Sequence, residues 1–128
     1  MNKNLTDLAL TILRIGFSGM MLTHGVAKLS LLSNPEKFPD PFGVGSQASL
    51  IFALLSEVVA PILVIIGYKT RLAVIPIILT MLVASFIIHG ADPFSSKELA
   101  LLYLTAFVAV ALSQPGKYSL DSILAKKS

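Results

Sequence analysis

Charged residues are so widely spaced in this chain that they leave four long apolar windows, and this spacing constrains the fold more than any other feature. The windows are Leu8–Ala27, Pro41–Tyr68, Leu72–Ala91 and Leu99–Gly116. Arg14 is the one charge in the first window and Glu57 the one charge in the second, while the other two contain none. Because a helix needs about 20 apolar residues to cross the core of a bilayer, the spacing predicts four membrane-spanning helices.

Helix-breaking residues fall between these windows. Three prolines and two glycines lie within residues 33–47, Gly67 precedes a polar turn at residues 68–71, and Gly90, Asp92 and Pro93 form the third break. Such residues end helices and form rigid connections. The predicted fold class is all-α, a polytopic membrane protein whose four-transmembrane-helix bundle forms a single domain over residues 1–128. The expected spans cover about residues 6–29, 48–67, 71–90 and 97–114.

The composition agrees with a membrane as the solvent and excludes several kinds of redox centre. Charged residues make up 13% of the chain, whereas soluble domains contain about a quarter. The chain has no cysteine. It therefore supplies no thiol or disulfide redox centre, no Cys-ligated iron–sulfur cluster and no thiolate zinc site of its own.

Basic residues predict how the bundle is oriented. With four spans, both termini and the middle loop lie on one side, which carries Lys3, Lys69, Arg71, Lys117, Lys126 and Lys127. The other side carries Lys28, Lys37 and Lys97. By the positive-inside rule, the N-terminus and the C-terminus of this multi-pass protein are expected in the cytoplasm.

Arg14 and Glu57 are the two charges that topology does not explain. Each lies about nine residues from the start of its span, which at about 1.5 Å per residue places both near the bilayer midplane. An unpaired charge at that depth costs at least about 2.5 kcal/mol, so we predict a buried charge pair between Arg14 and Glu57. The sequence leaves open whether this pair only fixes the register of two helices or takes part in proton or ligand handling.

A second polar group is expected at the non-cytoplasmic end of the bundle. His24 and Lys28 lie one turn apart near the end of the first span, and His89 ends the third. If the spans form a compact bundle, six candidate ligand-binding residues converge in one mouth above the charge pair: His24, Lys28, Asp40, His89, Asp92 and Tyr103. Such a mouth suits a quinone head group, an anion or another small polar ligand.

Each histidine also has a simpler interpretation, as an interfacial or helix-capping residue. Two histidines on different helices are compatible with haem ligation, but the chain has one such pair and both members lie near an interface. We therefore favour a quinone over haem as a cofactor. No His or Glu spacing is typical of a metal site, so no metal is predicted, and no catalytic residue is assigned.

Motifs for other chemistry are absent from the sequence. It contains no Gly-rich phosphate loop, dinucleotide fingerprint or nucleophile elbow. The Lys126-Lys127 tail is more typical of a topology determinant or a lipid head-group contact than of a nucleic-acid patch. The expected partner is thus the lipid bilayer, with no nucleic acid.

Several short motifs, taken in order, resemble the DoxX family of small four-helix membrane proteins. They are Leu13-Arg14-x-Gly16, His24-Gly25-x-x-Lys28-Leu29, Phe38-Pro39-Asp40-Pro41-x-Gly43, Ser56-Glu57, Gly67-x-x-Thr70-Arg71 and Gly116-x-x-Ser119-x-Asp121. The resemblance covers nearly the whole chain. The recurrent polar positions of the family match Arg14, His24, Lys28, Asp40, Glu57 and Arg71 of this sequence.

The resemblance implies a bacterial or archaeal inner-membrane protein. The family is related to subunits of an archaeal thiosulfate:quinone oxidoreductase, which implies a redox role linked to quinones. Other members resemble partners in oxidative-stress complexes, and distant eukaryotic relatives act as assembly chaperones for membrane receptors.

Two functional hypotheses follow. The first is a subunit of a quinone-linked or oxidative-stress oxidoreductase system, with a small-molecule pocket at its outer side. The alternative is a non-catalytic accessory or assembly subunit of a larger membrane protein complex. Four short helices leave little room for both a redox centre and a substrate site, so other membrane proteins are the expected partners in either case. Homo-oligomerisation stays open, and a transporter role lacks the broken helices typical of transporters.

Overall fold

The computed structural model describes residues 3–113 and 116–127 of the chain. In chain order its helices are α1 (Lys3–Lys28), the 3₁₀ turns η1 (Leu29–Ser33) and η2 (Pro35–Lys37), α2 (Ser46–Leu54), the π-helical turn η3 (Leu55–Val59), α3 (Ala60–Ile66), α4 (Thr70–Val83), the π-helical turn η4 (Ala84–Ile88), α5 (Phe94–Leu112) and α6 (Leu120–Lys127). The described residues form no strand. The predicted all-α class is therefore confirmed.

Four helical stretches of the described chain are long and apolar enough to cross a membrane. They are Lys3–Ser33, Ser46–Ile66, Thr70–Ile88 and Phe94–Leu112. The first is longer than expected, because residues 28–33 contain no proline or glycine and the helix continues through η1. Lys28, which the sequence placed at the end of this span, consequently lies five residues inside it.

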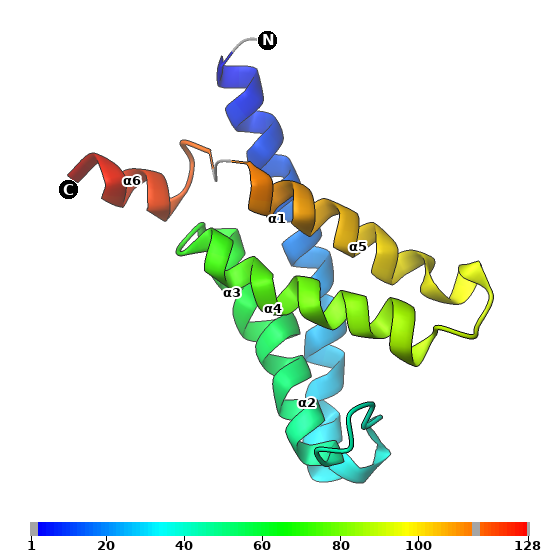
Figure 1. Cartoon of the computed structure of the whole chain (residues 1–128). Coiled ribbons are helices and arrows are strands. Elements are labelled where there is room, and N and C mark those ends of the chain that lie inside the picture. The colour runs from blue at the N-terminus through cyan, green and yellow to red at the C-terminus, as the bar shows by residue number, and fades with distance from the viewer. Residues whose placement is uncertain (1–2, 114–115, 128) are drawn as a thin grey trace.

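The spans form two antiparallel hairpins (Figure 1). In the first hairpin, α1 packs on η3 and α3, and in the second, α4 packs on α5. The hairpins meet through the contacts of α1 with α5 and of α3 with α4, and they diverge toward α2 and η4. We call the end that holds the start of α1, the α3–α4 turn and residues 116–127 the terminal side, and the end that holds residues 29–45 and 89–93 the distal side.

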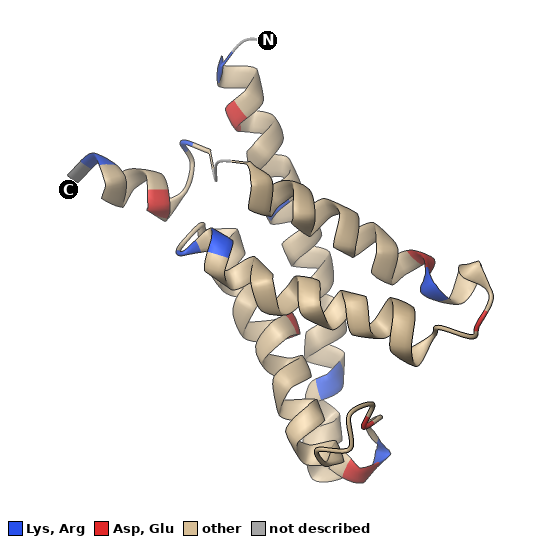
Figure 2. Ribbon diagram, viewed as in Figure 1, with Lys and Arg blue, Asp and Glu red and all other residues tan. Residues whose placement is uncertain are grey.

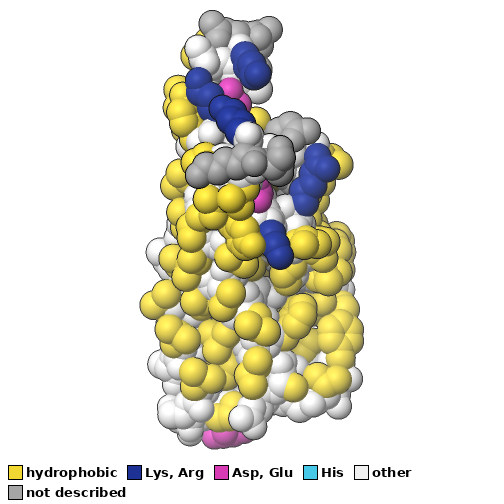
Figure 3. Space-filling view, turned by 90° about the vertical axis from the view of Figure 1, so that its left-hand side faces the viewer, with side chains coloured by type: hydrophobic (Ala, Val, Ile, Leu, Met, Phe, Trp, Pro, Cys, Tyr) yellow, Lys and Arg dark blue, Asp and Glu magenta, His cyan; other side chains and the backbone are white. Residues whose placement is uncertain are grey.

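The interior of the bundle is small and its outer surface is apolar. Fully buried core side chains include Met21, Val64, Val74, Ile77 and Phe107. Many large apolar side chains point outward instead, and Figure 3 shows them covering most of one face beyond the basic terminal side. Apolar surface of this extent is unfavourable in water and suits the hydrocarbon of a bilayer.

Glycine ends the first hairpin on the terminal side. Gly67 caps α3 with a φ of 78°, a left-handed conformation that costs glycine little. A side chain here would also collide with a neighbour, because a Cβ on Gly67 would lie 2.4 Å from the Cβ of Ser119. This turn therefore brings the C-terminal segment into contact with the bundle.

A π-helical turn and a proline interrupt the second span around Glu57. Pro61 has no N–H to donate to the carbonyl of Glu57, four residues earlier, so the regular helical ladder is broken there. Gly25 of α1 packs directly on this carbonyl, since a Cβ on Gly25 would lie 2.2 Å from the Glu57 oxygen. The close approach fixes Glu57 level with the last turn of α1.

Candidate functional site

Arg14 and Glu57, the two charges predicted to pair, occupy separate sites. The carboxylate of Glu57 accepts a hydrogen bond from the amine of Lys28, with Nζ and Oε2 2.5 Å apart. The guanidinium of Arg14 donates to the main-chain carbonyls of Tyr118 at 2.8 Å and Ile65 at 3.4 Å. The predicted Arg14–Glu57 pair is therefore wrong, although both side chains are buried.

The positions of Arg14 and Lys28 along α1 explain why Glu57 bonds Lys28 and not Arg14. Lys28 follows Arg14 by 14 residues on one helix, which separates their Cα atoms by about 21 Å along the axis. Helical side chains also lean toward the N-terminus, so the long side chain of Arg14 extends further toward the terminal side. The expected depths of Arg14 and Glu57 were each counted from the start of an expected span, but the first span is longer than expected and runs from Lys3 to Ser33.

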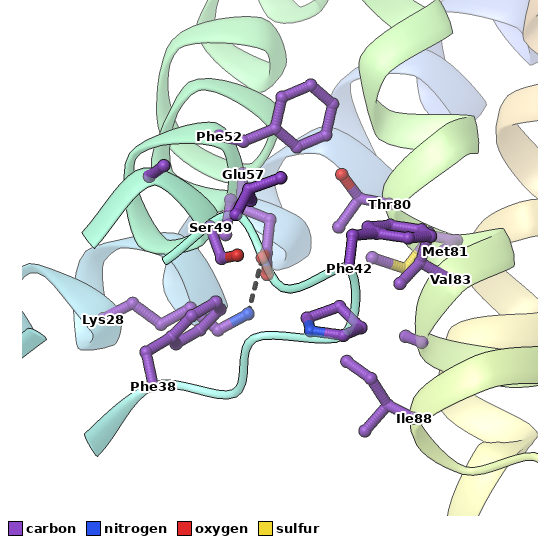
Figure 4. Close-up of a pocket in the computed structure, with 15 residues that line it drawn as sticks. Lys28, Phe38, Phe42, Ser49, Phe52, Glu57, Thr80, Met81, Val83 and Ile88 are labelled. Carbon is purple, nitrogen blue, oxygen red and sulfur yellow. Dashed lines mark hydrogen bonds and ion pairs between the residues drawn. The ribbon is translucent and has the colours of Figure 1, made fainter. Parts of the chain in front are cut away.

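A cavity of about 430 Å³ lies on the distal side, where the two hairpins diverge. Figure 4 shows its walls. They come from α2, from α4 and η4, and from the loop between the first two spans, with the rings of Phe38, Phe42 and Phe52 among them. The Lys28–Glu57 ion pair forms one wall, and the amine also lies 5.9 Å from the centre of the Phe38 ring. We call this cavity the distal pocket.

The polar atoms of the distal pocket are few and differ in their bonding. The side chain of Glu57 is 3% exposed, whereas that of Lys28 is 32% exposed. The hydroxyl of Thr80 is buried and has no hydrogen-bond partner among the described residues. An apolar cavity with one charge pair and one unpaired hydroxyl suits a flat or chain-like ligand that carries a single polar group.

Asp40 shapes the loop that covers this pocket. Its carboxylate accepts hydrogen bonds from the N–H groups of Val44 at 3.0 Å and Gly45 at 2.8 Å, and from the hydroxyl of Ser49 at 3.1 Å. The bond from the Gly45 N–H is the main cause that lowers the pKa of Asp40 below its usual value. Asp40 does not itself line the pocket. It holds the loop from which Phe38 and Phe42 reach the cavity.

The other predicted ligand residues lie apart from the pocket. The His24 ring meets the Tyr103 ring edge to face, with centroids 5.8 Å apart, on the contact between α1 and α5. His89 bonds Asp92 within the α4–α5 loop, with Nδ1 and Oδ2 2.9 Å apart. Of the six residues expected in one mouth, Lys28 lines the distal pocket and the other five do not. The single mouth is therefore wrong, because the hairpins diverge on this side instead of closing together.

A second polar site lies on the terminal side around Asp121. Its carboxylate accepts hydrogen bonds from the N–H of Lys69 at 2.7 Å and from the N–H and hydroxyl of Thr70 at 2.9 and 2.8 Å. Burial acts to raise the pKa of Asp121, but these hydrogen bonds and the positive charge of Arg14 outweigh it and lower that pKa below its usual value. Asp121 therefore caps the first turn of α4 from another helix.

Several residues of these two sites escaped sequence reasoning. The rings of Phe38 and Phe42 lie in the proline-rich loop, Phe52 lies in α2, and Thr80 lies in a charge-free span, so no charge marks any of these positions. Asp121 and Thr70 were noted in family motifs without a role. The sequence feature that indicates a cavity is the pair of aromatic residues flanking Pro39-Asp40-Pro41, since rings beside a rigid loop often cover a cavity.

Metal ligation has no visible basis in the described part of the chain. Residues 3–113 and 116–127 hold no cluster of three or more His, Cys, Asp or Glu side chains close enough to share a metal ion. The polar side-chain groups that line the distal pocket are the Lys28 amine, the Glu57 carboxylate and the hydroxyls of Ser49 and Thr80.

The fold and the apolar surface define a multi-pass membrane protein. Within this class, the model of the DoxX family matches residues 9–90. A Haemophilus influenzae protein of uncharacterized function is 34% identical over 125 residues, covering 92% of each chain. A second uncharacterized protein of that organism is 27% identical over 96 residues, covering 71% of this chain and 64% of its own length. No solved structure matches. The chain belongs to the DoxX family.

Proposed function

We propose that the chain is an inner-membrane subunit of a quinone-linked or oxidative-stress oxidoreductase system and binds a quinone-like molecule in the distal pocket. The pocket itself carries this proposal. Its volume of about 430 Å³ and its aromatic walls match a ring with an apolar tail, and it opens where the hairpins diverge within the membrane.

The polar groups of the pocket support recognition of a carbonyl-bearing ring. The Lys28 amine is a donor with hydrogens left beyond its bond to Glu57, and the Thr80 hydroxyl lacks a partner among the described residues. A quinone oxygen is an acceptor and fits the partly exposed Lys28 amine. Glu57 accepts a hydrogen bond from the amine and so holds it in place.

The same pocket also fits the accessory hypothesis. Binding of a quinone requires no electron carrier in this chain, so a partner protein would bring the redox centre. In the accessory case the ligand in the pocket is a lipid or a fixed quinone that stabilises the subunit. Turnover by a purified complex distinguishes the two roles.

Orientation belongs to the same proposal. The terminal side carries Lys3, Lys69, Arg71, Lys117 and Lys126, and Figure 2 shows basic residues concentrated there. We place this side in the cytoplasm by the positive-inside rule, which opens the distal pocket toward the outer half of the membrane. Labelling of single cysteines introduced at Lys37 and at Lys126 in intact cells tests this, because a reagent that cannot cross the membrane should react only at position 37.

A tryptophan reporter tests quinone binding directly. The chain has no tryptophan, so Phe42→Trp places a single indole at the pocket, and a soluble quinone analogue should quench its fluorescence at low micromolar concentration. Phe94→Trp is the matched control, because Phe94 follows Asp92-Pro93 as Phe42 follows Asp40-Pro41, and the two are 63% and 61% exposed. Phe94 does not line the pocket. Equal quenching of both would mean only partition into detergent and would reject the proposal.

The ion pair offers a second measure in the same assay. Lys28→Gln removes the charged donor and leaves the buried carboxylate of Glu57 unpaired, so it should weaken quenching about tenfold or more. Glu57→Gln keeps the donor and leaves an amine that is partly exposed, so a smaller loss of about threefold is expected. The reverse order would show that Glu57, and not Lys28, contacts the ligand.

A further inference from the structure

A basic cleft opens on the terminal side, far from the distal pocket. Its volume is about 670 Å³, and it lies between the first turns of α1, the start of α4 and the segment 116–126. Five basic side chains line it: Lys3, Lys69, Arg71, Lys117 and Lys126. Figure 3 shows basic side chains gathered at this end of the molecule, beyond the apolar surface of the spans.

The two acidic residues of the cleft accept hydrogen bonds from the protein itself, although the Oδ2 atom of Asp7 is buried without a partner among the described residues. Both oxygens of Asp121 accept hydrogen bonds from Lys69 and Thr70, and its charge is attracted to Arg14 beneath the cleft. Asp7 accepts a bond from the N–H of Lys117. Within the described chain, no salt bridge joins any of the five basic side chains to a carboxylate. The cleft therefore keeps an excess of positive charge.

The surroundings of the cleft are those of a membrane surface. Lys69 and Lys117 lie over the rings of Tyr68 and Tyr118, with amine-to-centroid distances of 5.5 and 5.1 Å. Tyrosines and basic residues at the ends of spans mark the interface of a bilayer. The short helix α6 leaves the bundle at this level (Figure 1) and exposes Ile123 and Leu124, which are 48% and 45% exposed. Acyl chains therefore have apolar surface to cover beside the cleft.

We propose that this cleft binds the phosphate-bearing head group of an anionic phospholipid. The amines and the guanidinium of Arg71 supply charge and hydrogen bonds to the phosphate. The exposed apolar side chains of α6 contact the acyl chains. A bound lipid would join α6 to the start of α4, on the opposite side of the membrane from the distal pocket, so its binding does not depend on the proposed function.

Native mass spectrometry of the full chain in a non-ionic detergent tests the site. Phosphatidylglycerol should occupy one site at a concentration several-fold lower than phosphatidylcholine requires. The double variant Lys69→Gln/Arg71→Gln should weaken phosphatidylglycerol binding about tenfold and leave phosphatidylcholine binding unchanged. Lys37→Gln/Lys97→Gln is the matched control, because it removes two positive charges from the distal side and should change neither.

Two results would overturn the proposal. Equal losses in the terminal and distal double variants would mean that net charge alone attracts the lipid. Displacement of phosphatidylglycerol by an equimolar amount of inorganic phosphate would mean that the cleft binds a free anion and not a lipid. A second pair, Lys3→Gln/Lys126→Gln, keeps the test valid if Arg71 is needed for folding, and it should show the same selective loss.

Discussion

The two sides of the bundle use buried charge in opposite ways. On the terminal side, Arg14 bonds the carbonyls of Tyr118 and Ile65 and attracts Asp121, which itself accepts three hydrogen bonds. On the distal side, Glu57 bonds Lys28 next to an open cavity. The first arrangement closes the structure around a charge, whereas the second keeps a charge pair beside space that a ligand can enter.

This difference separates structure from function among residues that look alike in the sequence. A cation whose donors bind main-chain carbonyls holds segments together, and substituting it should first reduce stability. A cation that shares a wall with a cavity has donors within reach of a ligand, and substituting it should first reduce binding. Substitution of Arg14 is thus expected to reduce stability first, and substitution of Lys28 to reduce ligand binding first.

The largest effect is expected for Arg14→Met. The variant leaves two carbonyls without this donor and removes the positive charge that acts on Asp121, which should lower the free energy of unfolding by about 3 kcal/mol. Loss of helicity with temperature in detergent measures it. Lys37→Met removes an exposed charge on the distal side and should change stability by less than about 0.5 kcal/mol.

Quenching of tryptophan fluorescence by the quinone analogue, measured on folded Arg14→Met in the Phe42→Trp background, then sharpens the comparison. It should remain within about twofold of the unsubstituted chain, because Arg14 does not line the distal pocket. If binding fell as much as stability, the two sides would not be independent, and the assignment of Arg14 to structure alone would be wrong.

The sequence predicted the number and class of the helices because charge-free length is set by bilayer thickness alone. It failed where two helices had to be aligned with each other. Nothing in the charge spacing shows that η1 prolongs the first span to Ser33 or that Gly25 seats Glu57 beside the last turn of α1. These two features determine that Glu57 bonds Lys28. The sequence therefore identified Arg14 and Glu57 as buried charges but predicted the wrong partner for each.

The candidate pocket was less predictable than the fold for a related reason. A pocket forms here because the hairpins, which meet through α1 with α5 and α3 with α4, diverge on the distal side, and no local motif shows how two hairpins pack on each other. Ring-bearing residues of a loop, such as Phe38 and Phe42, then become walls. Charged residues in a span indicate a site because charge in a membrane is costly. The apolar residues of the pocket walls cannot be told from other lipid-facing residues in the sequence.

A smaller loss of stability is expected for Gly25→Ala on the distal side. The added Cβ would lie 2.2 Å from the Glu57 carbonyl oxygen, so α1 and η3 must separate, at a cost of about 2 kcal/mol. Gly16→Ala and Gly19→Ala are controls on the same helix, because a Cβ at either position meets nothing within 4 Å. Alanine is the better helix former, and both controls should be neutral or slightly more stable.

This variant also tests whether the ion pair depends on close packing. A shift of η3 moves Glu57 away from Lys28, so Gly25→Ala should weaken quinone quenching in the Phe42→Trp background as well as stability. An intact quinone site in a destabilised Gly25→Ala chain would show that the contact of α1 with η3 supports the fold without positioning the pocket.

The smallest effect is expected from acid on the terminal side. Asp121 has a lowered pKa in the folded chain, so its carboxylate favours folding above the ordinary value of 3.8, and this contribution disappears as the pH falls below 3.8 through the lower folded pKa. Protection of the α6 amides from hydrogen exchange, corrected for intrinsic rates, should therefore fall about threefold between pH 5 and pH 2.5.

The control is Asp121→Asn, whose α6 amides should show weaker protection that no longer changes in this pH range. If the variant kept the same pH dependence, Asp121 would not be the carboxylate responsible, and the prediction would be wrong. The α6 amides are the right reporter for the terminal side, because acid also protonates Asp40, whose carboxylate holds the loop over the distal pocket.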